Sequence, residues 1–134
     1  MMNAQSGATI VVAEDTPDIR DVVELILEEL GYDVVSVPNG ERCLEVVQRC
    51  RPCLVLMDLS MPRLDGWEAT RRLKADHATS NIPVLAFTAH VQECELNDAR
   101  QAGCAGVITK PFEIDDLLRM ITEVIHDAPL PSVA

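Results

Sequence analysis

The sequence predicts an α/β fold in which a five-stranded parallel sheet is doubly wound and carries helices on both faces. Two observations support this prediction. Short apolar runs alternate five times with amphipathic stretches along the chain. Most of these runs are rich in Val, Ile and Leu, as expected of strands that are buried on both faces. Alternating strands and helices favour βαβ units, and such units build a parallel sheet.

The first half of the chain contains three predicted strands and two predicted helices. The strands are residues 9–13, 33–37 and 54–57. The first helix has Thr16 as its N-cap and Pro17 in its first turn, and Gly31 ends it. Its apolar residues recur at helical spacing and are Val22, Val23, Ile26, Leu27 and Leu30. Asn39 caps the second helix, whose apolar residues are Cys43, Leu44 and Val47.

The second half completes the alternation with two more strands, residues 83–88 and 106–109. A largely polar third helix runs from residue 66 to about residue 76 and exposes Arg71, Arg72 and Lys74. A weakly patterned fourth helix is expected over residues 91–102. The fifth helix has one apolar stripe, formed by Ile114, Leu117, Leu118, Ile121 and Ile125. The proline-containing tail, residues 128–134, should be loosely held.

The length of 134 residues suits a single domain, whose core we expect over about residues 8–127. The formal charge of −11 disfavours nucleic acid and anionic membranes as partners, because both repel acidic surfaces. No apolar run approaches the roughly 20 residues that cross a bilayer, and residues 1–8 lack the pattern of a signal peptide. We therefore expect a cytoplasmic protein.

The five cysteines form an odd set without the regular pairing of a disulfide scaffold. They are Cys43, Cys50, Cys53, Cys94 and Cys104. Free thiols are expected in a reducing compartment. Cys50 and Cys53 have the C-x-x-C spacing of redox and zinc sites. However, no second pair lies at zinc-site spacing, and this disfavours a metal or redox role.

A doubly wound, flavodoxin-like (βα)5 sheet binds ligands beyond the carboxyl ends of its strands, where the strand order reverses. Glu14 and Asp15 follow the first strand, and Asp58 follows the third. Acidic residues are common in turns, but carboxylates so close together repel one another unless a cation lies among them. Oxygen ligands suit Mg²⁺. We hypothesise that Asp15, Asp58 and the backbone carbonyl of Ser60 bind Mg²⁺ directly, while Glu14 acts mainly through water.

Two further polar residues end the remaining strands. Thr88 ends the fourth strand and Lys110 follows the fifth, so a hydroxyl and an ammonium join the carboxylates at one edge. Each group has a use if Asp58 attacks a phosphorus atom, because Lys110 and Thr88 can then hold the phosphoryl oxygens. Taken singly, Lys110 is a solvated lysine and Thr88 an ordinary β-branched strand residue. The combined set favours phosphoryl transfer.

Four motifs in this order resemble the receiver domains of bacterial-type response regulators. They are Val-Val-Ala-Glu-Asp (11–15), Leu-Met-Asp-Leu-Ser-Met-Pro-Arg-Leu-Asp-Gly (56–66), Phe-Thr-Ala (87–89) and Thr-Lys-Pro-Phe (109–112). The resemblance implies a role for each site residue: Asp58 as phosphoacceptor, Glu14 and Asp15 as the acidic metal pair, Thr88 as the switch hydroxyl and Lys110 as the phosphoryl partner. It also implies one receiver domain over residues 1–134.

The resemblance implies partners as well. A histidine kinase or a histidine phosphotransfer protein is the expected donor, and the receiver is not an enzyme beyond catalysing its own phosphorylation and dephosphorylation. Because only a short tail follows the fifth helix, we expect a receiver without an effector domain of its own. A receiver excised from a hybrid kinase would look similar, although Met1 and the short leader favour a complete small protein. The output is expected through partner binding at the face of helix four, strand five and helix five, or through a phosphorelay.

Val107 departs from the family pattern, since a switch aromatic is expected three residues before the lysine. Thr88 and the loop into helix four must then carry more of the signal, while His90 is expected to be a passive surface residue. Three other functions are weighed against this one. A flavin-binding carrier is disfavoured because acidic residues replace the phosphate-binding loop after the first strand. An aspartyl phosphatase would carry Asp-x-Asp there, and a degenerate receiver would bind partners without phosphorylation.

Overall fold

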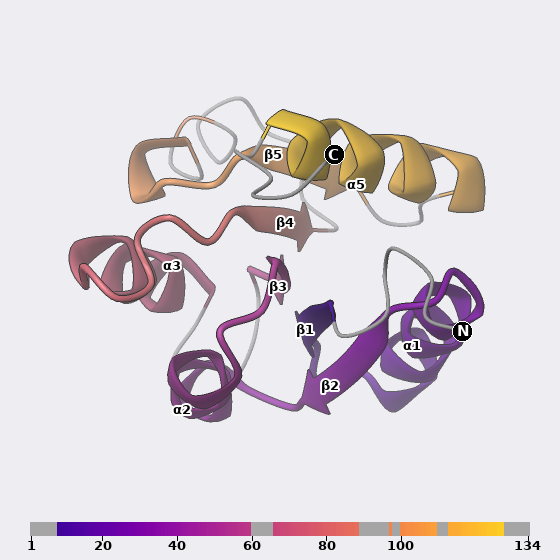
Figure 1. Ribbon diagram of the computed structural model, residues 1–134, viewed down its shortest axis with the longest axis horizontal. Coiled ribbons are helices and arrows are strands. Elements are labelled where there is room, and N and C mark those ends of the chain that lie inside the picture. The colour runs from indigo at the N-terminus through magenta and orange to yellow at the C-terminus, as the bar shows by residue number, and fades with distance from the viewer. Residues whose placement is uncertain (1–7, 60–65, 89–96, 98–99, 110–112, 128–134) are drawn as a thin grey trace.

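The computed structural model describes residues 8–59, 66–88, 97, 100–109 and 113–127. Within this part of the chain, five strands form one sheet in the order β2-β1-β3-β4-β5 (Figure 1). The strands are β1 (Thr9–Ala13), β2 (Asp33–Val37), β3 (Leu54–Asp58), β4 (Val84–Thr88) and β5 (Gly106–Thr109), and every neighbouring pair is parallel. The helices are α1 (Pro17–Glu29), α2 (Gly40–Cys50), α3 (Gly66–Ala75) and α5 (Ile114–Asp127). The predicted doubly wound parallel sheet is confirmed.

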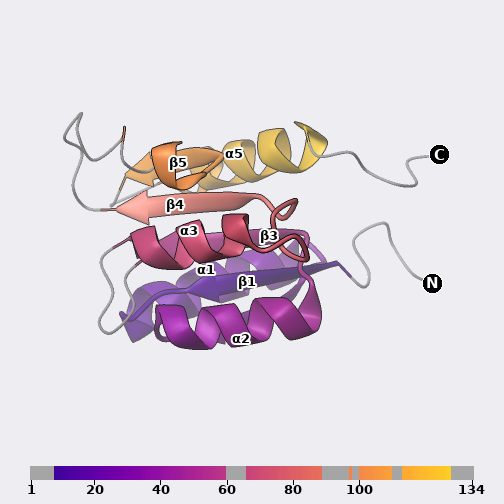
Figure 2. The ribbon, with the colours of Figure 1, turned by 90° about the vertical axis from the view of Figure 1, so that its left-hand side faces the viewer.

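Helices cover both faces of the sheet, with α1 and α5 on one face and α2 and α3 on the other (Figures 1 and 2). Successive strand residues point to opposite faces, so each face has its own apolar cluster. Ile10 and Leu54 belong to the cluster beneath α1 and α5, whereas Val11 and Val55 belong to the cluster beneath α2 and α3. Burial on both faces explains why the strands are continuous apolar runs in the sequence. Among the described helices, none has the length and apolar character needed to span a membrane.

The observed strands agree with the predicted ones, apart from two differences of one residue. β3 continues through Asp58, and the next amide, Leu59 N, still donates a hydrogen bond across the sheet to Phe87 O at 3.2 Å. β4 starts one residue after Pro83. The Pro83 carbonyl accepts a hydrogen bond from Val55 N at 3.0 Å, but proline has no N–H to continue the ladder.

The predicted apolar stripe of α1 is only partly correct. Thr16 occupies the N-cap position, although its side chain makes no capping hydrogen bond. Val23 and Leu27 are buried, whereas Val22 and Leu30 are 52% and 41% exposed, so their assignment to the buried stripe is wrong. Successive residues lie about 100° apart around a helix, which places Val22 beside the buried stripe. Leu30 lies at the C-cap, where the helix has ended.

The prediction for α2 is confirmed. The Asn39 side chain accepts a hydrogen bond from a first-turn N–H at 2.9 Å, and Cys43 and Val47 are fully buried. Of the predicted fourth helix, residues 97 and 100–102 are helical. Its other residues lie outside the described part of the chain, as does the tail, residues 128–134.

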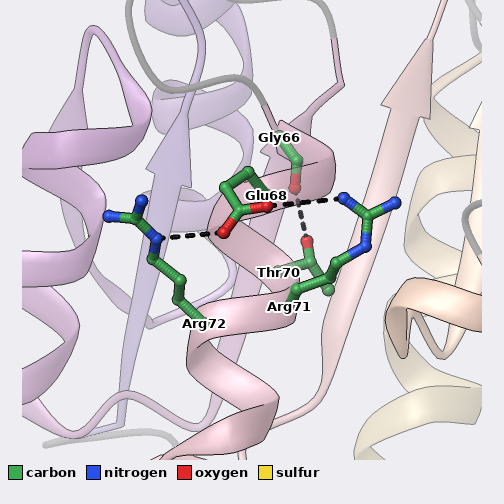
Figure 3. A network of polar contacts seen from close by, with 5 residues as sticks. All are labelled: Gly66, Glu68, Thr70, Arg71 and Arg72. Atoms are coloured by element: carbon green, nitrogen blue, oxygen red, sulfur yellow. Dashed lines mark hydrogen bonds and ion pairs between the residues drawn. The ribbon is translucent and has the colours of Figure 1, made fainter.

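The polar surface of α3 is organised around Glu68 (Figure 3). Its carboxylate pairs with Arg71 at 3.5 Å and with Arg72 at 3.1 Å, and both arginines are exposed as predicted. Lys74 is not exposed. Its Nζ donates hydrogen bonds to two backbone carbonyls before β4, at 3.2 and 2.6 Å, and burial lowers its pKa. A lysine stem can cover apolar surface while its ammonium finds acceptors, so a charged residue need not lie on the solvated face.

The apolar stripe of α5 is confirmed except at its first residue. Leu117 and Ile121 are buried, and Leu118 and Ile125 are half-buried. Ile114 is 51% exposed, contrary to the prediction. Helical side chains lean toward the N-terminus of their helix, so the first side chain extends beyond the helix instead of over the sheet.

The geometry of Cys50 and Cys53 argues against a shared redox or metal site. Cys50 is the exposed last residue of α2. Cys53 packs against the cluster on the opposite face of the sheet, beneath α1 and α5. Cys43, Cys50, Cys53 and Cys104 are all free thiols, as predicted, and burial raises the pKa of Cys43 to about 12. Cys94 lies outside the described residues.

These environments predict an order of thiol alkylation. Only the thiolate reacts, so exposed Cys50 should be alkylated first by iodoacetamide at pH 8, and buried Cys43 only after unfolding. Mass spectrometry of the digested protein measures each site separately, with the urea-unfolded chain as control. Labelling of Cys43 as fast as Cys50 in the folded protein would contradict the burial of the Cys43 side chain.

Cys43 also gives a pH dependence with a definite sign. An unfolded chain loses this thiol proton near pH 9.0 and the folded chain only near pH 12. The folded state therefore holds more protons between these values, and its stability falls as the pH rises through them. Cys43→Ala should make the free energy of unfolding decline less steeply between about pH 9 and pH 11.

Candidate functional site

Three carboxylates meet where β1 and β3 end. β1 and β3 are neighbours whose last paired residues are Ala13 and Met57, so the residues that follow, Glu14 and Asp58, lie side by side. The ligand oxygens of Glu14, Asp15 and Asp58 all lie within 4.8 Å of one another. Glu14 and Asp58 are buried, with 0% and 2% exposure, while Asp15 is exposed. The cluster is thus closed on the protein side and open on one side to solvent.

The strand order explains why the carboxylates meet at this point. From β1 the chain moves outward to β2, and it then passes back to β3 on the other side of β1. The direction of winding reverses between β1 and β3. In such sheets the connections leave in opposite directions at the reversal and open a crevice at the carboxyl ends, which is where ligands bind.

Hydrogen bonds hold Glu14 and the turn after β1 in place. The Glu14 amide donates to Val37 O at 3.0 Å, which extends the β1–β2 pairing by one residue. Glu14 Oε2 accepts from Thr16 N at 3.0 Å, and the Glu14 carbonyl accepts from Arg20 Nη1 at 2.9 Å. The amide of the α1 N-cap therefore binds the buried carboxylate, so α1 and the acidic cluster are positioned together.

The backbone of Asp58 is clamped between β4 and α3. Leu59 N donates to β4, and Gly66 N donates to Leu59 O at 3.3 Å. A Cβ atom on Gly66 would lie 2.3 Å from Asp58 O and 2.7 Å from Leu59 Cα, so only glycine fits this contact. Thr70 Oγ1 donates to Gly66 O at 2.7 Å and holds the first turn of α3 in position (Figure 3).

The donor set fits a hard divalent cation. Three like charges within 4.8 Å, two of them buried, repel one another. A cation among them relieves that repulsion, and carboxylate oxygens are the ligands that Mg²⁺ prefers. One exposed carboxylate leaves space for the waters that Mg²⁺ usually retains.

The other predicted site residues are described only in part. Thr88 ends β4 and pairs with Thr109 of β5, so its backbone lies at the same edge as the acidic cluster. Ser60, Lys110 and His90 lie outside the described residues. Sequence reasoning placed Gly66 only at the end of a motif and at the start of the third helix, because its contact with Asp58 joins residues that no periodic pattern relates.

Comparisons with known proteins agree with this geometry. The profile of the response regulator receiver domain family matches residues 10–122. The polar-differentiation response regulator DivK of Brucella anthropi is 31% identical over 120 residues, covering 90% of this chain and 98% of DivK. Protein PilH of Pseudomonas aeruginosa is 34% identical over 118 residues, covering 88% of this chain and 98% of PilH.

Two further matches differ in kind. The DNA-binding dual master transcriptional regulator RpaA of Synechocystis is 32% identical over 117 residues, which are 87% of this chain and 48% of RpaA. This chain thus spans about half of RpaA. Among solved structures, the receiver domain of the sensor histidine kinase PA1611 from Pseudomonas aeruginosa has a TM-score of 0.84 at 33% identity, covering 91% of this chain and all of that one. That structure has a magnesium ion coordinated in its active site cleft.

The tight contact at Gly66 predicts a marked difference between two glycine substitutions. Gly66→Ala should lower the free energy of unfolding by about 2 kcal/mol, because its Cβ meets backbone atoms that cannot move aside. Gly106→Ala is the matched control, since its Cβ meets only the tips of two side chains at 2.9 and 3.0 Å. Urea unfolding measures both variants. Equal losses would contradict the clamp on Asp58.

The acidic cluster predicts that removing one charge stabilises the fold when no divalent cation is present. Asp58→Asn keeps the side-chain volume and should raise the free energy of unfolding by about 1 kcal/mol in EDTA. Asp21→Asn, on the exposed side of α1, is the control and should change little. Added Mg²⁺ should stabilise the wild type by linkage and Asp58→Asn much less. Equal stabilisation of both would place the ion elsewhere.

Proposed function

The chain belongs to the response regulator receiver domain family, and from this premise we propose that it accepts a phosphoryl group from a phosphohistidine donor onto Asp58 in a Mg²⁺-dependent reaction. The observation that carries the proposal is the meeting of Glu14, Asp15 and Asp58 at the point where the sheet reverses its winding. Asp58 lies at the end of a buried strand with its backbone clamped, and this suits a nucleophile whose position must be fixed.

The proposed reaction makes one bond and breaks one. A carboxylate oxygen of Asp58 attacks the phosphorus atom and the phosphorus–nitrogen bond of the donor breaks. The electron pair of that bond stays on the imidazole nitrogen, and the ring leaves as neutral imidazole with a proton that its other nitrogen carries or that solvent supplies. An acyl phosphate on Asp58 is the product. Little else is required of the protein, because phosphoryl transfer depends mainly on positioning and on stabilising charge.

The remaining residues have proposed supporting roles. Asp15, Asp58 and the Ser60 carbonyl would hold Mg²⁺ directly and Glu14 through water; when bound, the ion neutralises charge on the transferring group. Lys110 and Thr88 would hold the phosphoryl oxygens. The family membership and the position of Thr88 at the site edge support these roles.

The proposed partners follow from the family. The donor is a histidine kinase or a histidine phosphotransfer protein, and the receiver catalyses only its own phosphorylation and dephosphorylation in the cytoplasm. The output would pass through partner binding at the face of helix four, β5 and α5, or through a phosphorelay. In support, β5 is an edge strand, and residues of β5 and α5, including Val107, Asp116 and Met120, line a hollow of about 320 Å³. The charge of −11 supports protein partners rather than nucleic acid or membrane.

The degenerate receiver is the less favoured function. The chain is similar over nearly the full length of DivK, which is named as a response regulator, and of PilH. It also has three carboxylates in one cluster. A module that bound partners without phosphorylation would have no need to bury two of them.

Intact mass tests the proposed chemistry. Incubation with acetyl phosphate and Mg²⁺ should add one phosphoryl group to the wild type, and the adduct should be lost with EDTA or with Asp58→Asn. Asp21→Asn should be phosphorylated like the wild type, because its carboxylate is exposed on α1 and does not belong to the acidic cluster. No adduct under any condition, including incubation with a histidine-phosphorylated donor, would favour the degenerate receiver.

A further inference from the structure

Trp67 is the only tryptophan of the chain and the second residue of α3. It is half-buried and packs against a small apolar cluster formed by buried Leu59 and Ala86. Cys104 and Val107 pack against the same cluster. We call these five residues the Trp67 cluster. Its buried members belong to neither of the larger clusters on the sheet faces, but Cys104 also packs against the cluster beneath α2 and α3.

The cluster is joined to the phosphoacceptor at two points of the backbone, Leu59 and Gly66. Leu59, one of its two buried members, directly follows Asp58. The Leu59 carbonyl accepts a hydrogen bond from Gly66 N, and Gly66, in tight contact with Asp58 O, directly precedes Trp67. A shift of the Asp58 backbone therefore moves both the ring's support, Leu59, and the ring's own attachment point.

The cluster also joins β3 to the two strands beyond it. Ala86 lies in β4, two residues before Thr88, and pairs in register with Val107 of β5. Trp67 thus packs on Leu59, which directly follows β3, and on Ala86 in the middle of β4, beside a β5 residue that packs on the same pair. The ring is therefore in contact with the strand that carries Thr88.

A second connection reaches the cluster from the start of β5. Cys104 Sγ lies 4.0 Å from Thr70 Oγ1, and the Thr70 hydroxyl donates to Gly66 O at 2.7 Å. The segment before β5 and the first turn of α3 are thereby held together. In the sequence of α3, Trp67 lies between the two residues that this hydrogen bond joins, directly after Gly66 and three residues before Thr70.

Trp67 is the largest side chain of the cluster and is therefore the member best able to contact all the others. Leu59, Ala86, Cys104 and Val107 are small or medium-sized, and the indole is by far the largest group among them. Protein interiors are packed too densely for a neighbour to shift without moving such a ring. Because Trp67 is half-buried, its ring also has solvent on one side into which it can move.

We propose that Trp67 is a positioning residue for the phosphoacceptor: its ring holds the end of β3 in register with β4 and β5 for phosphoryl transfer, and it changes environment when Asp58 is loaded. This inference rests on the proposed function. It assigns the aromatic coupling element to α3, since β5 carries valine at the position where the sequence pattern led us to expect an aromatic residue.

Fluorescence of the wild-type protein tests the change of environment, because Trp67 is the only indole. The Cys104 thiol is a contact quencher of indole emission, so a small change of spacing alters the intensity. On adding acetyl phosphate in the presence of Mg²⁺, we expect intensity and emission maximum to shift with the same time course as the phosphoryl adduct in intact mass. Asp58→Asn should show no such shift.

The two proposals fail in different ways. An adduct that forms while the fluorescence stays constant overturns the role of Trp67 and leaves the proposed function intact. Absence of any adduct on the wild type, with acetyl phosphate and with a histidine-phosphorylated donor, overturns both.

Variants test the positioning role. Trp67→Ala should slow phosphorylation by about tenfold, which is the scale expected when a nucleophile is displaced by a fraction of an ångström. Trp67→Phe restores an aromatic ring and should recover most of the rate. Leu73→Val is the matched control, since Leu73 lies buried on the same helix but in the cluster beneath α2 and α3. It should lower stability without slowing phosphorylation.

Thermal unfolding of each variant separates positioning from folding. A Leu73→Val protein that is slowed as much as Trp67→Ala would show that any loosening of α3 has this effect, and this would overturn the proposal. A normal rate for Trp67→Ala would also overturn it. The proposal is supported if Trp67→Phe recovers the phosphorylation rate while its thermal stability equals that of Trp67→Ala.

Discussion

The parallel pairing of β1 with β3 imposes the central constraint on this protein, because it buries two carboxylates side by side at the strand ends. Glu14 and Asp58 are 0% and 2% exposed, and Asp15 lies within 4.8 Å of both. Burying like charges so close together destabilises a fold. The surrounding structure must offset this cost, and much of what is distinctive in the chain follows from how it does so.

Two apolar clusters supply the rigidity that the site needs. Successive strand residues contribute to opposite faces, so the same strands that end in carboxylates are anchored in both clusters. The turn after β1 is then fixed by hydrogen bonds from Thr16 and Arg20. The turn after β3 is fixed by the close approach of Gly66. The acidic residues are therefore held together by contacts of their backbone, to which the Glu14 carboxylate adds the hydrogen bond from Thr16 N.

The sequence predicted those features that depend on local pattern or on strand ends. The five strands were recognisable because burial on both faces removes polar residues from them, and Glu14, Asp15 and Asp58 followed from the rule that the carboxyl ends of parallel strands meet. The helix errors have a different origin. Helical spacing alone did not distinguish Val22 from its buried neighbour Val23, because a stripe has a width that depends on what packs against it.

Contacts between distant residues left no pattern to read. Lys74 is a charged residue within α3, and its sequence position suggests exposure. It is half-buried because the segment before β4 brings two carbonyls within hydrogen-bond distance of its ammonium. The C-x-x-C spacing of Cys50 and Cys53 suggested a pair, but the chain crosses from one face of the sheet to the other between them. The cluster around Trp67 unites residues from four separate segments, and no sequence window contains them.

The net charge of −11 acts in the same direction as the buried carboxylates. A negative field concentrates cations at the acidic cluster and repels anionic phosphodonors. A free small donor must approach against this field, whereas a protein donor can offset it with basic groups at its docking surface. Arg71 and Arg72 on α3 share the single carboxylate of Glu68, which offsets part of their positive charge. Under the proposed function, the charge of the chain therefore favours phosphoryl transfer from a docked partner over transfer from solution.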